Sequence, residues 1–269
     1  MQVAVQGISV YVKTLGTGPP TLLLHGNPDS ADLWDGLIEL LSPNLHCVAP
    51  DLPGFGRSTA PADFDCSLEN LARFIDGLVE ALQITVPLNL VVHDLGGAYG
   101  FAWAIRRHWK VRRLVAINTL FFSDYRWHTW ARIWRTPLLG EISMALMNQW
   151  VFSRALRRAS PRLSADHIRQ AYELLTPAVK RMVLRLYRAT DPETFAWWED
   201  HLRAMTVRVP ALVLWGDQDP YIPKRYAERF GARKVVHFPA HGHWLPAEAP
   251  AKVAEQLLPF FEAAKTVQS

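Results

Sequence analysis

The sequence predicts an α/β protein with a mostly parallel central sheet, flanking helices and an inserted helical cap. Three observations lead to this prediction. The chain has 269 residues, enough for one large domain or for one domain with an insertion. Short apolar runs alternate with amphipathic stretches, which is typical of βαβ units. The alternation stops after about residue 119 and resumes at about residue 210.

The predicted strands are short apolar runs, as expected for strands that are buried in a parallel sheet. The first twelve residues also alternate in polarity like a strand. The six apolar runs are Thr21–Leu24, His46–Ala49, Leu88–His93, Leu114–Ile117, Ala211–Trp215 and Lys234–Phe238.

Helices are expected between these strands. The stretch after Ser67 has apolar residues on one helical face, and Ser67 is a suitable N-cap. A second helix should follow Asp94, and the last should run from about Pro250 to Phe261. The face of the first helix consists of Leu68, Leu71, Phe74, Ile75, Leu78 and Leu82.

Residues 120–209 are predicted to form the cap, and residues 1–119 and 210–269 the core domain. The cap segment has helical patterns, prolines at 137, 161, 177 and 192, and many tryptophans and arginines. These side chains could form the core of the cap, an aromatic wall around an apolar substrate, or a surface that touches lipid. We favour the first interpretation, because tryptophan is usually well buried.

Composition excludes several classes of function. The net charge of +4 comes from 29 Lys+Arg and 25 Asp+Glu without a basic run, so no nucleic-acid partner is expected. The two cysteines, Cys47 and Cys66, lack the spacing of zinc ligands, and we expect reduced thiols and no metal. The chain shows neither a signal-peptide pattern nor a long uncharged apolar run, which favours a cytoplasmic protein.

A predicted strand runs directly into Asp94, and Gly96 and Gly97 follow. A sharp turn from strand to helix needs small residues where the chain folds against itself. This is the setting of a nucleophile elbow, with aspartate in place of the serine of G-x-S-x-G. Val92 stands where that pattern has its first glycine.

With this elbow, the chain resembles the α/β-hydrolase superfamily over nearly its whole length, which implies the α/β-hydrolase fold. An aspartate at the elbow resembles the branch of haloalkane dehalogenases and epoxide hydrolases. Three more segments match the superfamily in their order. The segment 25–28 resembles the oxyanion-hole loop, 214–220 the acid loop, and 241–244 the loop of the catalytic histidine.

The resemblance implies a catalytic set of Asp94 as nucleophile, Asp219 as acid and His243 as base. Asp217 is the alternative to Asp219, and His241 is the alternative to His243. The spacing after the glycine favours Asp219, and the Gly-His-aromatic order favours His243.

The chemistry agrees with these residue types. A carboxylate with a pKa near 3.9 is ionised at neutral pH, so Asp94 could attack a saturated carbon without a base. The product would be an alkyl ester, which water could hydrolyse with His243 as base. The backbone N–H groups of Asn27 and Leu95 would form the oxyanion hole. His25 and His93, beside these loops, are expected to make structural hydrogen bonds.

The leaving group distinguishes the two enzyme types. A halide needs N–H donors, and Asn27 matches one donor position of haloalkane dehalogenases. Leu95 stands where those enzymes carry a tryptophan, and its side chain donates nothing. Trp150 of the cap is a candidate replacement and a candidate pocket residue.

An epoxide oxygen needs an acid, which epoxide hydrolases supply from tyrosines of the cap. Tyr187 resembles the second of these tyrosines, and Tyr125 and Tyr172 are candidates for the first. Tyr125 is also a candidate pocket residue. Asn27 stands where epoxide hydrolases usually have an aromatic residue.

The sequence thus predicts a hydrolase of small apolar electrophiles that uses water and a covalent ester, with epoxides ahead of haloalkanes. No organic cofactor or metal is expected. A non-catalytic ligand-binding protein of the same fold is the alternative from another class. We expect a monomer or homodimer, and we do not favour membrane contact of the cap.

Overall fold

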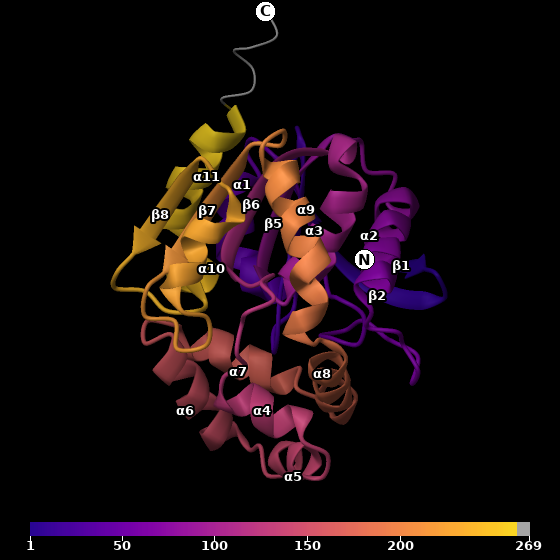
Figure 1. The fold of residues 1–269 in the computed structure, drawn as a ribbon, viewed down its shortest axis with the longest axis vertical. Coiled ribbons are helices and arrows are strands. Elements are labelled where there is room, and N and C mark those ends of the chain that lie inside the picture. Colours follow the sequence, from indigo (N-terminus) through magenta and orange to yellow (C-terminus); the bar gives the residue numbers. More distant parts are fainter. Residues whose placement is uncertain (263–269) are drawn as a thin grey trace, which may run out of the picture.

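An eight-stranded sheet crosses the computed structural model, which describes residues 1–262 (Figure 1). The strand order is β1-β2-β4-β3-β5-β6-β7-β8. The pairs β1-β2 and β2-β4 are antiparallel, and all later neighbours are parallel. The strands are β1 (Gln2–Val5), β2 (Ile8–Leu15), β3 (Pro20–Leu24), β4 (His46–Pro50), β5 (Leu88–Asp94), β6 (Val111–Thr119), β7 (Ala211–Gly216) and β8 (Lys234–Phe238).

Each of the six predicted apolar runs lies within one of the strands β3 to β8, so the predicted fold class is confirmed. The alternating segment at the start of the chain is two strands instead of one. Gln6 and Gly7 have φ angles of 51° and 80°, which reverse the chain in a tight hairpin between β1 and β2.

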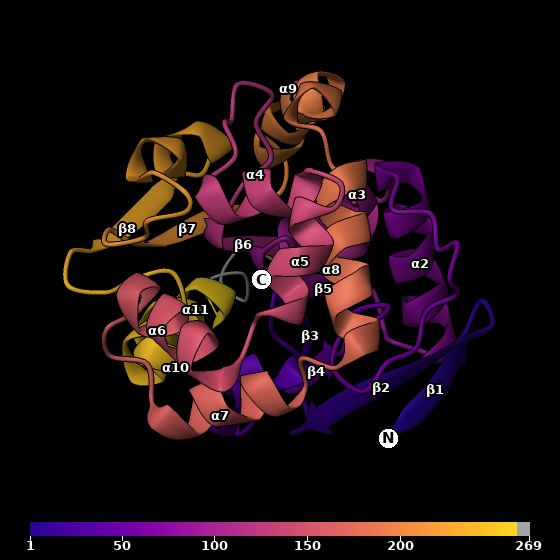
Figure 2. The same cartoon turned by 90° about the horizontal axis from the view of Figure 1, so that it is seen from below.

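Helices cover both faces of the sheet (Figure 2). On one face, α3 (Gly96–Arg106) packs against α2 (Leu68–Ala81) and α9 (Ala196–Thr206). On the other face, α11 (Pro250–Glu262) packs against α1 (Asp35–Leu41) and α10 (Leu245–Glu248). Ser67 is the N-cap residue of α2, as predicted, because its Oγ accepts a hydrogen bond from the N–H of Asn70.

The core lies between the sheet and these two helical layers. Every residue of β5 and β7 is buried. Burying one Val, Leu or Ile side chain stabilises the fold by about 1.5–3 kcal/mol, so these central strands form a firm base for the loops at their ends.

The cap follows β6 and lies against one end of the sheet, in the lower part of Figure 1. Its helix α4 packs against α5 and α8, and α6 packs against α7. The cap helices are α4 (Thr129–Arg135), α5 (Leu139–Ala145), α6 (Gln149–Ala159), α7 (Ala165–Glu173) and α8 (Pro177–Ala189).

Helix α9 lies within the range predicted for the cap but packs against α3 of the core. Its apolar face is buried there, and the Arg106 guanidinium of α3 lies 5.2 Å from the ring of Trp198. In terms of packing, the cap therefore comprises α4 to α8, and α9 completes the helical layer of the core.

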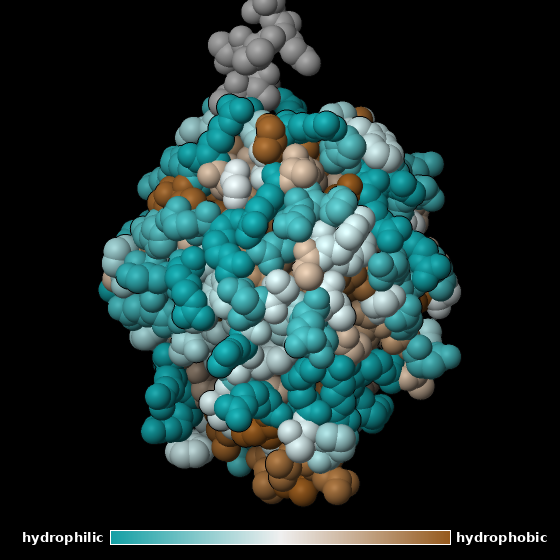
Figure 3. Space-filling view, viewed as in Figure 1, coloured by the Kyte–Doolittle hydropathy of each residue, from teal (hydrophilic) through white to brown (hydrophobic). Residues whose placement is uncertain are grey.

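The tip of the cap exposes apolar side chains (Figure 3). They gather over α5 and include Leu138 and Leu146, which are 76% and 70% exposed. Within residues 1–262, no helix is long and apolar enough to cross a membrane.

No cluster of three or more His, Cys, Asp or Glu side chains in residues 1–262 could hold a metal ion. Cys47 and Cys66 are buried and free. Burial raises the pKa of both thiols to about 12.

Candidate active site

The candidate nucleophile Asp94 is the last residue of β5 and begins the turn into α3. Its φ angle is 47°, an uncommon backbone conformation for a residue with a side chain. Thr119 at the end of β6 donates a hydrogen bond of 2.6 Å from Oγ1 to the carbonyl oxygen of Asp94. The turn therefore has the geometry predicted for a nucleophile elbow, and a neighbouring strand holds it in place.

Glycines make this close approach possible. A Cβ atom on Gly96 would collide with the backbone of Leu24, and one on Gly97 would collide with Thr119 Oγ1. On the other side, a Cβ on Gly26 would collide with the side chain of Asp94. The loop after β3 thus lies against the side chain of Asp94, and the start of α3 lies against the ends of β3 and β6.

Val92, the departure from the elbow pattern, is accommodated by a glycine elsewhere. A Cβ on Gly100 of α3 would collide with Cγ1 of Val92. The Val92 side chain therefore occupies the space that a side chain at position 100 would need, and β5 and α3 stay close together at the turn.

Three predicted side chains meet at this turn. His243 Nδ1 lies 2.7 Å from Asp219 Oδ2, and His243 Nε2 lies 3.7 Å from Asp94 Oδ1. The other oxygen of Asp219 accepts hydrogen bonds of 2.7 and 3.0 Å from the N–H groups of Tyr221 and Ile222. All three side chains are buried.

The two alternatives lie outside this set. Asp217 Oδ1 contacts His237 Nδ1 at 2.5 Å, and its second oxygen lies 3.7 Å from Lys224 Nζ. The ring of His241 packs against Phe238, with 5.9 Å between the ring centroids. Geometry thus favours Asp219 and His243 over Asp217 and His241.

The sequence analysis missed Asn118, which orients Asp219. Asn118 Nδ2 donates to Asp219 Oδ2 at 2.9 Å and to the carbonyl oxygen of Gly216 at 3.1 Å. Its Oδ1 accepts from the N–H of Gly216 at 2.8 Å. Asn118 could have been noticed in the sequence as the polar residue that directly follows the apolar run Leu114–Ile117.

His25 and His93 serve the backbone, as expected. The N–H of Leu52 donates to His25 Nε2 at 2.9 Å, and His25 Nδ1 lies 2.7 Å from the carbonyl oxygen of Gly26. His93 Nε2 lies 2.9 Å from the carbonyl oxygen of His243. Burial, with the nearby His243, lowers the pKa of His93 to about 3, so its ring is neutral and donates this bond.

The predicted oxyanion donors face the carboxyl group of Asp94. The N–H of Asn27 donates to Asp94 Oδ2 at 2.8 Å. Burial raises the pKa of Asp94, while His243 and the N–H groups of Asn27 and Leu95 oppose that rise. The same two dipoles would therefore stabilise any negative charge on this oxygen.

The pKa values of the His243–Asp219 pair move in opposite directions. Burial alone would lower the pKa of His243, but the attraction of Asp219 and then of Asp94 raises it. Burial alone would raise the pKa of Asp219, but His243 and the hydrogen bonds to Ile222 and Asn118 lower it. Asp219 is thus a stable anion that favours a proton on the imidazole.

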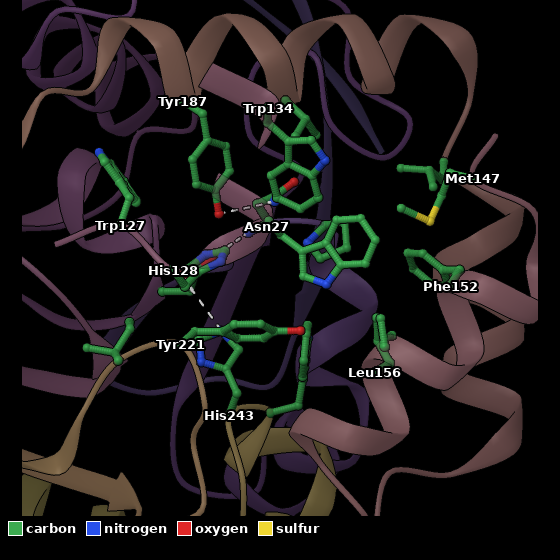
Figure 4. A pocket seen from close by; sticks show the side chains of 18 of the residues that line it. Asn27, Trp127, His128, Trp134, Met147, Phe152, Leu156, Tyr187, Tyr221 and His243 are labelled. Atoms are coloured by element: carbon green, nitrogen blue, oxygen red, sulfur yellow. Dashed lines mark hydrogen bonds and ion pairs between the residues drawn. The ribbon is translucent and has the colours of Figure 1, made fainter. Parts of the chain in front are cut away.

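Asp94, His243 and Asn27 line a cavity between the core and the cap. Figure 4 shows this cavity with Asn27 and His243 labelled. Its empty volume is about 680 Å³. Most of its wall is aromatic or aliphatic, which suits an apolar ligand. The wall includes Leu120, Tyr125, Trp127, Trp130, Trp134, Met144, Met147, Phe152, Leu156, Val183, Tyr187 and Ile222.

Tyr187 of α8 reaches the cavity beside Asn27 (Figure 4). Asn27 Nδ2 donates a hydrogen bond of 3.4 Å to the phenol oxygen. The rings of Trp127 and Trp134 hold the phenol, each with its centroid 5.1 Å from that of Tyr187. Burial raises the pKa of Tyr187 well above its usual value, so the phenol is protonated and its O–H can donate a hydrogen bond to a ligand.

The other two candidate tyrosines differ from Tyr187. Tyr125 lines the cavity, but its hydroxyl donates to the carbonyl oxygen of Tyr221 at 2.9 Å. Tyr172 lies on α7 and packs against Phe152, with 5.6 Å between the ring centroids. Tyr172 is not among the residues that line the cavity.

The structure does not bring the candidate pocket residue Trp150 to this cavity. Trp150 is 70% exposed, whereas Phe152 and Leu156 of the same helix line the cavity. Phe152 and Leu156 are four positions apart and share one face of the helix. Trp150 is two positions before Phe152 and therefore points to the opposite side. The orientation of α6 therefore places Trp150 on the outer surface.

Further donors, which the sequence analysis missed, line the cavity. Within residues 1–262, the buried indole nitrogens of Trp127 and Trp134 have no hydrogen-bond partner. His128 Nδ1 accepts the N–H of Ala131 at 3.2 Å. Burial and the nearby His243 lower the pKa of His128 to about 4, so the neutral ring carries its proton on Nε2.

Comparison with known proteins agrees with this fold. A family model described as the alpha/beta hydrolase fold matches residues 19–250. The chain belongs to this family, as the resemblance of its motifs implied.

The chain is similar to curated proteins of two kinds. It is 31% identical over 238 residues to a haloalkane dehalogenase of Mesorhizobium japonicum, covering 82% of this chain and 76% of the relative. It is 31% identical over 234 residues to a cis-3-alkyl-4-alkyloxetan-2-one decarboxylase of Xanthomonas campestris, covering 79% of this chain and 77% of the relative.

Solved structures of haloalkane dehalogenases are similar over nearly the full length. The enzyme of Bradyrhizobium elkani has a TM-score of 0.84 and 27% identity, with 98% of both chains covered. A putative ancestral haloalkane dehalogenase has a TM-score of 0.83 and 28% identity, with 98% of this chain and 99% of the other covered.

Proposed function

We propose that this protein is a hydrolase that opens epoxides through a covalent ester on Asp94. The observation that carries the proposal is the phenol of Tyr187, hydrogen-bonded to Asn27 in the cavity that Asp94 also lines. An ionised nucleophile and a protonated acid in one apolar cavity are what ring opening of an epoxide requires.

The first step joins Asp94 to the substrate. A carboxylate oxygen of Asp94 attacks a ring carbon, the carbon–oxygen bond of the epoxide breaks, and the departing oxygen takes the proton of Tyr187. Asn27 Nδ2, 3.4 Å from the phenol oxygen, stabilises the phenolate that remains. The product of this step is a hydroxyalkyl ester of Asp94.

The second step hydrolyses the ester. His243 Nε2 takes a proton from water, whose oxygen attacks the ester carbonyl carbon, and the N–H groups of Asn27 and Leu95 stabilise the oxyanion. Collapse releases the diol oxygen, which takes the proton back from His243. The carboxyl proton of Asp94 then returns to Tyr187, which completes the cycle.

Ester formation also adjusts the base. In the free protein the charge of Asp94 is one of the causes that raise the pKa of His243. The ester has no charge, so this contribution disappears and the pKa of His243 falls. A lower pKa leaves more of the imidazole neutral at the step that needs a base.

Haloalkane hydrolysis is the second candidate. A halide could be held by the amide of Asn27 and by the indole N–H groups of Trp127 and Trp134, which have no hydrogen-bond partner among residues 1–262. Similarity to haloalkane dehalogenases supports this alternative. The oxetan-2-one in the name of the other relative is, like an epoxide, a strained oxygen ring, which supports an oxygen leaving group.

A product screen separates the two candidates. Alkyl and aryl epoxides and bromoalkanes are incubated with the protein, and diol and bromide are measured. We expect diol from epoxides, and a loss of about 100-fold in this activity for Tyr187→Phe, because the acid is removed. Bromide release without diol formation would favour dehalogenation, and Asn27→Ala would then lower it more than Tyr187→Phe.

A further inference from the structure

An open groove lies on the outer side of the active-site cavity, between α4 and α6. The groove and the cavity share four lining residues: His128, Trp130, Ala155 and Tyr221. Trp150 of α6 lines the outer part of the groove. The groove therefore meets the cavity at this shared wall.

Two arginines of α6, Arg154 and Arg158, give the groove its charge. No Asp or Glu of residues 1–262 lines it, and neither arginine forms an ion pair with these residues. The two arginines are four positions apart on one helix, where like charges repel each other. A nearby anion would relieve this repulsion.

The two arginines are placed for a ligand that extends out of the cavity. The guanidinium of Arg154 lies 5.9 Å from the ring of Trp150 in the groove. Burial raises the pKa of Tyr221, and the charge of Arg158 opposes that rise. Tyr221 belongs to the shared wall. Proximity to a helix C-terminus explains a cation at Arg158, but Arg154 lies one turn earlier, outside the last turn of α6.

The cavity itself is unfavourable for a carboxylate. Asp94 is its anionic residue, and His128 is neutral there. A buried carboxylate would be repelled by Asp94 and would lose its hydration, and any positive charge on His243 is already attracted by Asp219 and Asp94. The groove, with its two arginines, is therefore the more favourable place for the anionic end of a substrate.

We propose that Arg154 and Arg158 form an anion-binding site at the mouth of the cavity, and that the substrates are apolar chains with a terminal carboxylate. The apolar chain fills the cavity and the carboxylate binds in the groove. The identity of the reacting group at the other end rests on the proposed function, whereas the carboxylate site does not.

The test uses probes that cannot react. Octanoate and decanoate are compared with octan-1-ol and decan-1-ol by titration calorimetry on the full chain at low salt. We expect each carboxylate to bind about tenfold more tightly than its alcohol, because hydrogen bonds to charged groups are the stronger ones. The preference should weaken as salt is added.

Variants locate the site. The double variant Arg154→Gln/Arg158→Gln should bind carboxylates and alcohols equally, with the affinity for alcohols unchanged. Arg181→Gln is the matched control, because Arg181 is an exposed arginine of α8 that lines neither the groove nor the cavity. Equal affinities in the unaltered protein, or a preference that survives the double variant, would overturn the proposal.

The two proposals fail separately. If the protein prefers carboxylates but forms no ester on Asp94, the proposal of an anion site is supported and the proposed reaction is refuted. Binding to anionic vesicles that needs both arginines, without any preference for soluble carboxylates, would assign the arginines to a lipid surface and overturn the substrate proposal.

Discussion

At the scale of single residues, the site depends on charges that are held away from water. Asp94, His243 and Asp219 are each no more than 9% exposed. Solvent screens buried charges only weakly, so removing one charge shifts the pKa values of the other two groups. Each side chain can therefore be tested through its effect on its neighbours.

We expect His243→Gln to trap the covalent intermediate. Asp94 attacks as a carboxylate and needs no base, and the N–H groups of Asn27 and Leu95 still oppose the rise of its pKa in this variant. Ester formation should therefore continue, but no base remains to activate water. Intact-mass spectrometry after incubation with an epoxide should show one added substrate, and peptide mapping should place it on Asp94. The double variant with Asp94→Asn is the control, and an adduct on that variant would refute the assignment.

A second residue-scale prediction concerns the elbow. Gly100→Ala should lower the free energy of unfolding by about 1–3 kcal/mol, because the new methyl group collides with Val92 Cγ1. Combined with Val92→Ala, the same change should cost less than the sum of the two single changes. Urea unfolding of the four proteins measures this coupling, and strict additivity would argue against the compensation.

At the scale of elements, the cap and the core are joined by a buried ion pair. His167 Nε2 of α7 lies 3.0 Å from Asp29 Oδ2, two residues after Asn27. Trp244 Nε1 donates to the same oxygen at 3.1 Å. The pair thus connects a cap helix to the loop that carries a candidate oxyanion donor.

The pair should make stability depend on pH. Burial alone would lower the pKa of His167, but Asp29 and the more distant Asp32 and Asp35 raise it above 6.5. His167 therefore stabilises the fold fully below pH 6.5 and loses this effect as the pH rises through the raised pKa. The pKa of Asp29 is lowered despite its burial, so its contribution disappears only in acid.

His167→Gln should accordingly lower the free energy of unfolding by about 1–3 kcal/mol at pH 6 and by less at pH 9. Chemical denaturation at both pH values measures the difference. His201→Gln serves as the control, because His201 is exposed and forms no ion pair with the described residues. A pH-independent loss would show that the pair does not titrate in this range.

At the scale of the whole molecule, the cap closes the cavity over the ends of the strands. Asp94 ends β5, Asn27 lies in the loop after the neighbouring strand β3, and Tyr187 comes from the cap. Substrate must therefore reach the core through the cap. The groove between α4 and α6 shares the lining residue Ala155 with the cavity, and we expect the entrance there.

Ala155→Trp should narrow this passage. We expect kcat/KM for long apolar substrates to fall about tenfold or more, with a smaller effect on the shortest substrates. Steady-state kinetics with a series of chain lengths measures this effect. Ala178→Trp, an exposed site on α8, is the control, and equal losses at all lengths would place the passage elsewhere.

Much of the fold could be predicted because it depends on local patterns. Apolar runs marked β3 to β8, and Ser67 marked the start of α2. The helix α9 could not be assigned to the core in this way, because its periodicity is like that of the cap helices. Its place depends on contact with α3, far away in the sequence.

The sequence by itself determined the strands β3 to β8, the start of α2, the elbow at Asp94 and the segments that carry Asp219 and His243. These features depend on the polarity and size of residues close together in the chain. Tertiary structure alone decided that Trp150 faces solvent, that Asn118 orients Asp219 and that Tyr187 meets Asn27. The last two residues are separated by 160 positions, so packing of the cap on the core brings them together.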